Sequence, residues 1–221
     1  MGPNDIKVLL NDVKHGNISI EDAVCRLEDL PYKDLGFAKI DNHRELRIGY
    51  PEVLYCAGKT IDQIKEIVKF MNTKNANILG TRATREMYEA VKEICSEAEY
   101  NELAGTFTVK KKEMAPTDSY IAIITAGTSD MSVSEEAAVT AETFGNKVVR
   151  INDVGVAGIH RLLSNLEIIR GAKVIVAVAG MEGALASVIG GLVDKPVIAV
   201  PTSVGYGANF GGLSALLSML N

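Results

Sequence analysis

The stretch Tyr120-Ile-Ala-Ile-Ile-Thr125, followed directly by Ala126-Gly-Thr-Ser-Asp130, decides the fold. Its first six residues are mostly aliphatic and carry no charge, which predicts a strand buried on both faces. The small and polar residues after it predict a tight turn, and the apolar spacing from Ser132 to Phe144 predicts a helix. A buried strand that leads into a helix in this way is the opening unit of a parallel sheet covered by helices.

The same alternation continues toward the C-terminus. Further strands are predicted over 148–151, 173–178 and 196–200, and helices over 158–170, over 182–192 and from 211 onward. Strands that alternate with helices join through right-handed crossovers. We therefore expect a three-layer, doubly wound parallel sheet of the α/β class.

The first half of the chain follows this logic less regularly. Two helices, over 6–15 and 19–30, predict a helical hairpin, and the polar stretch 32–50 predicts an extended connection. A strand–helix–strand–helix pattern over 53–97 and a β-hairpin over 99–110 predict a smaller α/β domain.

The turn-forming segment Ala115-Pro-Thr-Asp118 separates the two halves. We therefore expect three parts, which are residues 1–50, 51–116 and 117–221.

Composition limits the class of protein. Of 221 residues, 47% are apolar and 23% are charged, as in ordinary globular proteins, and the net charge of −5 argues against nucleic acid as a partner. No apolar run reaches the about 20 residues that a membrane span needs, and the N-terminus has no signal segment. Three scattered cysteines fit reduced thiols, so we expect a cytoplasmic protein that does not bind membranes.

Ligands bind doubly wound sheets at the carboxyl ends of the strands. After the first predicted strand, Gly127, Thr128 and Ser129 offer backbone N–H groups and hydroxyls to a phosphate, and Asp130 suits ribose hydroxyls or a metal ion. The alternative is that the serine and the aspartate only cap the following helix.

The second strand end carries Asp153, His160 and Arg161. A histidine there can act as an acid or a base near neutral pH, although a lone histidine on a helix is more often structural.

The third strand end carries Gly180, Met181 and Glu182. The glycine lets backbone approach a ligand closely. The acid stands in an otherwise apolar stretch, which suits a general base with a raised pKa, and the alternative is that it only complements the helix dipole.

The fourth strand end is the segment from Val200 to Gly212, which holds four glycines and the hydroxyls of Thr202 and Ser203. Flexible backbone rich in donors suits contacts with phosphate or adenine. These patterns together predict an anionic, nucleotide-like ligand at the edge of the sheet, and they leave the reaction open.

Longer blocks carry a resemblance to known families. The segments Gly127-Thr-Ser-Asp130, His160-Arg161 and Ala179-Gly180 resemble the PurE family of aminoimidazole ribonucleotide carboxylases and mutases. The whole chain resembles the LarB family, which begins the synthesis of the nickel-pincer nucleotide cofactor. This second resemblance rests on Asp34–Asp41 with His43-Arg44, Glu52–Thr60, Thr125–Asp130, Asp153–Arg161, Ala179–Gly183 and Pro201–Gly207.

The LarB resemblance implies an enzyme that carboxylates the pyridinium ring of nicotinic acid adenine dinucleotide with CO2 or bicarbonate. It also implies cleavage of the phosphoanhydride, which releases AMP and pyridinium-3,5-biscarboxylic acid mononucleotide. Because a pyridinium ring is electrophilic, a thiolate must add to it before it can attack CO2. Cleavage of the anhydride calls for Mg2+ to gather the phosphate charge.

The resemblance also implies roles for individual residues. Ser129 and Asp130 would hold the ribose-phosphate or its Mg2+, and Glu182 would be the base. His160 stands where PurE has its catalytic histidine. Weaker candidates for the site are Asp153, Arg161 and Ser203, and Lys59 and Arg82 are candidates for the second phosphate or the adenosine, with solvated charges as the alternative.

The nucleophilic cysteine of the LarB family follows in a Ser-Cys-Ala-Pro-Gly-like segment just after the position of Leu216–Asn221, where this sequence stops. Either the tail is missing from it or this member lacks the nucleophile, and Cys25, Cys56 and Cys95 are not expected to replace it. Two alternatives therefore stay open: a PurE-like carboxylase or mutase that acts on aminoimidazole ribonucleotide, and a nucleotide-binding assembly without catalysis. Both resemblances imply a symmetric homo-oligomer, a tetramer or an octamer.

Overall fold

The computed structural model describes residues 2–28, 30–74, 76–114 and 117–221. The chain divides into two compact units. Unit 1 comprises Met1–Tyr100 and Thr106–Glu113, and unit 2 comprises Asn101–Gly105 and Met114–Asn221. The boundary predicted at residue 116 lies outside the described residues.

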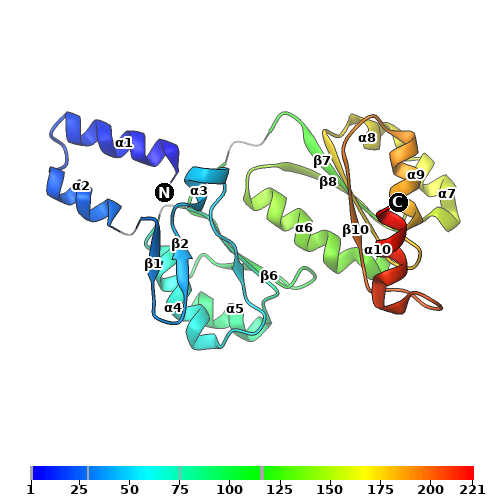
Figure 1. Ribbon diagram of the computed structural model, residues 1–221, viewed down its shortest axis with the longest axis horizontal. Coiled ribbons are helices and arrows are strands. Elements are labelled where there is room, and N and C mark those ends of the chain that lie inside the picture. Colours follow the sequence, from blue (N-terminus) through cyan, green and yellow to red (C-terminus); the bar gives the residue numbers. More distant parts are fainter. Residues whose placement is uncertain (1, 29, 75, 115–116) are drawn as a thin grey trace. The chain divides into compact units, whose positions relative to one another are not determined.

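Unit 2 contains the parallel sheet. Its strands are β7 (Tyr120–Thr125), β8 (Lys147–Ile151), β9 (Val174–Ala179) and β10 (Val197–Pro201). They lie in the order β10-β9-β7-β8, and each neighbouring pair is parallel (Figure 1). Numbered along the chain this order is 2-1-3-4, which is the flavodoxin-like form of the doubly wound sheet. The predicted fold class is confirmed.

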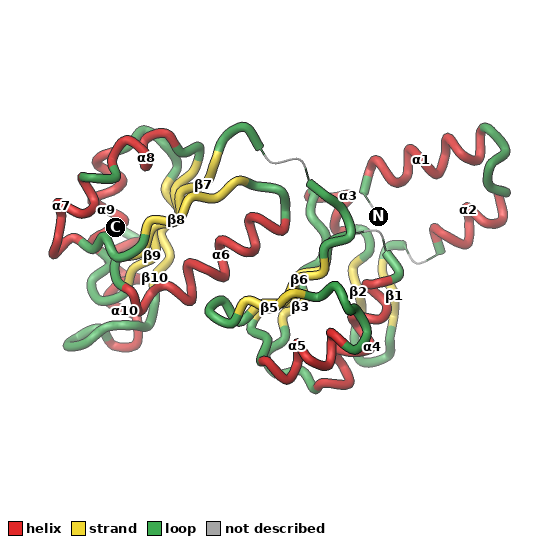
Figure 2. The backbone as a smooth tube through the Cα atoms, turned by 180° about the vertical axis from the view of Figure 1, so that it is seen from behind, coloured by secondary structure: helices red, strands yellow, loops and turns green. Residues whose placement is uncertain are grey.

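Helices cover both faces of this sheet. They are α6 (Met131–Thr143), α7 (Ile159–Leu163), α8 (Leu166–Gly171), α9 (Ala184–Leu192) and α10 (Leu213–Met219). Ala138 of α6 packs with Ile123 and Val178 on one face. The helices α7, α8 and α9 pack on the other face, around Ile124 and Ile175, which completes the three layers (Figure 2).

The single helix predicted over 158–170 is wrong, because two short helices occupy this stretch. The break lies between Leu163 and Leu166. There Ser164 Oγ donates to the Arg161 carbonyl at 2.8 Å, and Asn165 Nδ2 donates to the same carbonyl at 2.9 Å. Such side-chain bonds compete with the backbone pattern that would continue a helix.

Unit 1 has a smaller mixed sheet. Its strands are β3 (Leu54–Tyr55), β4 (Ile78–Thr81), β5 (Glu99–Asn101) and β6 (Thr106–Val109), in the order β3-β4-β6-β5. The pair β3 and β4 is parallel, and the pair β4 and β6 is antiparallel. The helices α4 (Ile61–Asn72) and α5 (Arg85–Lys92) follow β3 and β4. Thr60 begins α4 with a capping box, since Thr60 and Gln63 each accept from the other's backbone N–H.

The expectation of an extended connection over 32–50 is wrong. The chain begins with helices α1 (Pro3–Lys14) and α2 (Ile20–Leu27). The stretch that follows them forms the antiparallel pair β1 (Tyr32–Asp34) and β2 (Lys39–Asp41) and the short helix α3 (Arg44–Ile48). Ile40 is buried in the same core as Leu54 and Cys56. Strands of three residues are too short to show an alternating pattern, so they could not be predicted from the sequence.

Among the described residues, no helix combines the length and the apolar character that crossing a membrane requires.

Candidate functional site

A cavity of about 500 Å³ opens at the carboxyl edge of the sheet in unit 2. Its walls come from the segments that follow β7, β8, β9 and β10, so the four strand ends that the sequence singled out do meet. In this strand order the switch point lies between β7 and β9, which is where doubly wound sheets bind ligands.

The cavity brings together part of the predicted set. The predicted residues that line it are Gly127, Ser129, Asp130, Arg161, Gly180, Met181 and Glu182. Thr128, Asp153, His160 and Ser203 are not among the lining residues. His160 is exposed on the first turn of α7, and Ser203 is exposed after β10. The roles of all these residues in binding and catalysis stay predictions.

Asp130 joins two walls of the cavity. Its side chain is buried, with 4% of the residue exposed. One carboxylate oxygen, Oδ2, accepts from the Gly127 backbone N–H at 3.0 Å, and the other, Oδ1, accepts from the Thr202 hydroxyl at 2.7 Å. The carboxylate therefore fixes the turn after β7 to the end of β10.

Arg161 supplies the positive charge of the cavity. Its Nη1 donates to Asp153 Oδ2 at 2.5 Å, and the Asp153 backbone N–H donates to Thr125 Oγ1 at 3.0 Å. Asp153 has a positive φ of 59°, which is uncommon for a residue other than glycine. Thus Asp153, which is not among the lining residues, orients the guanidinium of Arg161.

Gly180 lines the cavity and also has a role in packing, while its predicted contact with a ligand stays a prediction. A Cβ at this position would lie 1.9 Å from the Val204 carbonyl oxygen. The next residue, Met181, has a φ of 52° and donates its N–H to that same oxygen at 3.1 Å. The absence of a side chain at Gly180 therefore lets the loop after β10 pack against the end of β9.

Sequence reasoning missed part of the lining. The lining residues outside the predicted set are Ala126, Gly155, Val156, Ala157, Ala179, Ala184, Leu185, Val204, Gly205 and Tyr206. The segment from Val200 to Gly212 was predicted to contact the ligand as a whole, but of its residues only Ser203 was named as a site candidate. The available signal was an aromatic residue between two glycines in a loop at a strand end.

The charged residues of the cavity determine whether it could bind a metal ion. Among the described residues that line it, Asp130, Glu182 and Arg161 carry charge. No three His, Cys, Asp or Glu side chains in the described part of the chain gather to form a metal site. Proteins commonly hold Mg2+ with one or two carboxylates and the phosphates of the substrate. Both oxygens of Asp130 already accept hydrogen bonds, and its part in holding Mg2+ stays a prediction.

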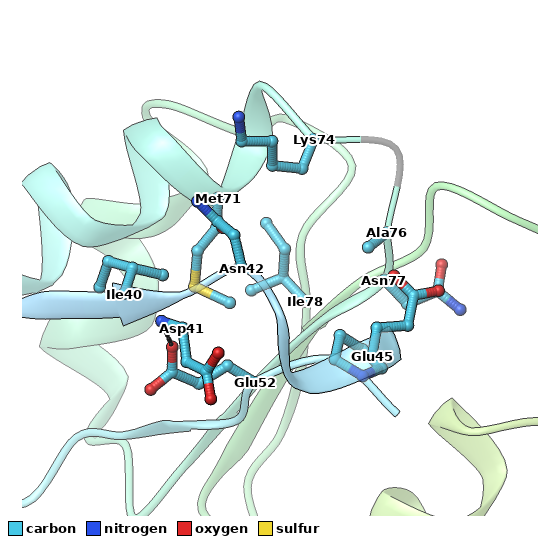
Figure 3. A pocket seen from close by; sticks show the side chains of 11 residues that line it. Ile40, Asp41, Asn42, Glu45, Glu52, Met71, Lys74, Ala76, Asn77 and Ile78 are labelled. Atoms are coloured by element: carbon cyan, nitrogen blue, oxygen red, sulfur yellow. Dashed lines mark hydrogen bonds between the residues drawn. The ribbon is translucent and has the colours of Figure 1, made fainter. Parts of the chain in front are cut away.

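Unit 1 holds a small pocket of about 40 Å³, shown in Figure 3. Asp41 and Glu52 line it, and the Asp41 backbone N–H donates to Glu52 Oε2 at 2.6 Å. The space suffices for a few water molecules, so it does not suit a nucleotide.

Lys59 and Arg82 both lie at strand ends of unit 1. Lys59 Nζ donates to the Tyr55 carbonyl at 2.6 Å, and Arg82 has a positive φ of 52° at the end of β4. Their part in binding a second phosphate stays a prediction.

The cysteines of the chain differ in exposure. Cys25 is exposed, whereas Cys56 and Cys95 are buried. Burial raises the pKa of the Cys56 thiol to about 11 and also raises the pKa of Cys95. Because the thiolate is the nucleophilic form, neither buried cysteine is activated for covalent catalysis.

Comparisons with known proteins agree with this architecture. The LarB/PurE-like N-terminal domain family matches residues 32–112, and the AIR carboxylase family matches residues 120–221. Uncharacterized protein MJ0165 of Methanocaldococcus jannaschii is 37% identical over 235 residues, which cover 100% of this chain and 88% of that protein. The N5-carboxyaminoimidazole ribonucleotide mutase of the same organism is 38% identical over 101 residues, which cover 44% of this chain and 59% of the mutase. A LarB-type N-terminal domain is thus followed by a PurE-like domain whose cavity lies at the carboxyl edge of its sheet, and the chain belongs to the LarB family of PurE-like carboxylases.

Proposed function

We propose that this protein carboxylates the pyridinium ring of nicotinic acid adenine dinucleotide and hydrolyses the phosphoanhydride to release AMP. The observation that carries the proposal is the charge of the cavity, where the carboxylates Asp130 and Glu182 accompany a single guanidinium, Arg161. An excess of negative charge favours a cationic ring over the neutral imidazole of aminoimidazole ribonucleotide.

The reaction requires a base, and Glu182 is the candidate. No cysteine is among the described residues that line the cavity, so the proposal needs a thiol from outside them. Addition of its thiolate would form a C–S bond and neutralise the ring, after which a ring carbon would attack CO2 and form the new C–C bond. Glu182 then accepts the proton from that carbon, and the C–S bond breaks to return the thiolate and the aromatic cation. Glu182 lines the cavity and is exposed, and no hydrogen bond to the described residues occupies its carboxylate, unlike that of Asp130.

Arg161 and Asp130 handle the phosphates in this proposal. The guanidinium, oriented by Asp153, binds a phosphate through its remaining N–H donors. Mg2+, when bound, neutralises charge on the anhydride as water attacks it. Asp130 would be its protein ligand, while keeping the segments after β7 and β10 together.

The test is turnover by the full-length gene product with nicotinic acid adenine dinucleotide, bicarbonate and Mg2+, followed by mass spectrometry. We expect AMP and a mononucleotide that has gained one carboxylate. Glu182→Gln should still bind the dinucleotide but form no carboxylated product, whereas the control Glu167→Gln, at an exposed position on α8, should behave as wild type. The absence of AMP from the wild-type protein, or normal carboxylation by Glu182→Gln, would contradict the proposal.

The similarity to a named N5-carboxyaminoimidazole ribonucleotide mutase favours a second candidate. In it, His160 would transfer protons on an imidazole ribonucleotide, and no thiol is needed. Turnover of carboxyaminoimidazole ribonucleotide that is lost in His160→Asn would support this function. Dinucleotide binding without turnover of either substrate would indicate a binding assembly.

We also propose that the protein forms a homo-oligomer, either a tetramer or an octamer. Leu217 and Leu220, near the end of unit 2, are 54% and 73% exposed, and such apolar residues are typical of interfaces. Light scattering coupled to gel filtration tests this, and a monomeric mass would refute it.

A further inference from the structure

Tyr206 is an aromatic residue at the cavity for which the described part of the chain provides no partner. It lines the cavity, yet it is 81% exposed, the highest value among the described large apolar side chains. A tyrosine ring gains free energy when its faces are covered. Its position at the mouth of a ligand-sized cavity indicates that a ligand covers it.

The loop that carries this ring is fixed at both ends. On one side, the Met181 N–H donates to the Val204 carbonyl at 3.1 Å. On the other side, the buried side chain of Asn209 donates to the Ser203 carbonyl at 3.3 Å and accepts from the Gly212 N–H at 2.9 Å. The base of the loop is therefore part of the cavity wall.

Glycines flank the ring at the tip of the same loop, and a Cβ at Gly207 would meet no atom within 4 Å, whereas Gly205 packs closely on Asn209 and Met181. Gly205 and Gly207, with φ of 149° and 71°, lie on either side of Tyr206. Glycine changes between such backbone conformations at little steric cost. The ring thus stands beside the cavity on a backbone segment whose second glycine, Gly207, is unhindered.

The charges of the cavity that Tyr206 lines indicate which ligand it prefers. The face of an aromatic ring is negative, and a cation above it is attracted. Glu182 adds a carboxylate to the same cavity. A flat ring that bears a positive charge gains from both groups, whereas a neutral ring gains only from stacking.

We propose that Tyr206 determines specificity for a cationic aromatic ring by stacking on the pyridinium ring of the bound nucleotide. This inference rests on the proposed function, because it concerns the substrate ring of that reaction. It assigns to Tyr206 a binding role that involves no proton transfer.

The test compares two ligands that differ in ring charge. Calorimetry on the full chain would measure binding of nicotinic acid adenine dinucleotide, of its dihydro form with a neutral ring, and of AMP. We expect wild type to bind the cationic form more tightly than the neutral form. Tyr206→Leu should weaken binding of the cationic form by about 3- to 30-fold, abolish the preference and leave AMP binding unchanged.

Two further variants separate stacking from damage to the loop. Tyr206→Phe keeps the ring and should keep the preference. Phe210→Leu alters a side chain that is 78% exposed in the same loop but does not line the cavity, so it should bind like wild type. Thermal unfolding of each variant should match wild type, since neither side chain contributes to the core.

Several results would overturn the inference. If Tyr206→Leu retains the preference for the cationic form, or weakens the binding of all three ligands equally, the Tyr206 ring does not select the charge of the ligand ring. Such a result in a protein that still binds or converts the dinucleotide leaves the proposed function standing. If wild type binds neither form of the dinucleotide, the proposed function fails and this inference fails with it.

Discussion

The close approach between Gly180 and the loop after β10 gives a prediction whose magnitude follows from the structure. A Cβ on Gly180 would lie 1.9 Å from the Val204 carbonyl oxygen and 2.8 Å from Thr202 Oγ1, and real Cβ contacts are not shorter than 3.0 Å. In Gly180→Ala the carbonyl must therefore retreat by about 1 Å. That movement breaks its hydrogen bond with the Met181 N–H, now 3.1 Å long.

The cost has two parts. Forcing a methyl group into a closely packed site destabilises by about 1–3 kcal/mol. Loss of the backbone hydrogen bond adds about 1 kcal/mol. We expect Gly180→Ala to lower the free energy of unfolding by about 2–4 kcal/mol, which for a chain of this length lowers Tm by roughly 4–16 °C. The shifted loop should also weaken nucleotide binding.

Differential scanning calorimetry measures the change, with Gly190→Ala as the matched control. Gly190 lies inside α9, and a Cβ there would meet no atom within 4 Å. Alanine at this position should stabilise the helix by about 0.5–1 kcal/mol. If Gly180→Ala has the same Tm as wild type and binds nucleotide normally, the packing of Val204 against Gly180 is not as described.

Three more predictions follow from buried groups and the cavity charge. At pH 8 iodoacetamide should label Cys25 in the folded protein but should label Cys56 only after unfolding, and peptide mass spectrometry would show this. Because burial raises the folded pKa of Cys56 to about 11, the stabilising contribution of the neutral thiol is complete below the unfolded pKa of about 8.5 and is lost as the pH rises through 11. Rapid labelling of Cys56 in the folded protein would refute this prediction. Thr202→Val removes the hydroxyl donor of buried Asp130 and should destabilise by about 1.5–3 kcal/mol in calorimetry, whereas Thr202→Ser should be milder; equal melting of Thr202→Val and wild type would contradict it. Arg161→Lys keeps the charge but loses the planar fork, so the Kd for the dinucleotide should rise about tenfold, and an unchanged Kd would remove Arg161 from phosphate binding.

The sequence was sufficient for the sheet of unit 2 because its strands are rich in aliphatic residues and end in glycine-containing or polar turns, although β8 also carries Lys147 and Arg150. Tyr120–Thr125 is the clearest example, and a fully buried parallel strand needs no partner to be identified. The three-residue strands β1 and β2 lacked any such run. Their place in the fold depends on the burial of Ile40 in a core formed by residues farther along the chain.

The candidate site was predictable in location but less so in its members. The topology of doubly wound sheets brings strand ends together, so Asp130 and Glu182 were found without coordinates. Whether a residue in such a segment faces the cavity depends on φ, ψ and side-chain packing. His160 and Arg161 are neighbours in sequence, yet only Arg161 lines the cavity. The sequence indicated that some group lies close to the backbone at Gly180. It did not indicate that one such group is the carbonyl oxygen of Val204.

The hydrogen bond between Thr202 and Asp130 joins residues 72 positions apart, and this separation has a kinetic consequence. Contacts between distant segments form late, because the entropy lost in closing a long loop must first be offset by other contacts. During synthesis, the turn after β7 exists well before the wall that contains Tyr206. Completion of the cavity therefore awaits the placement of β10, and any ligand that binds only the finished cavity would draw incompletely folded chains toward the native state.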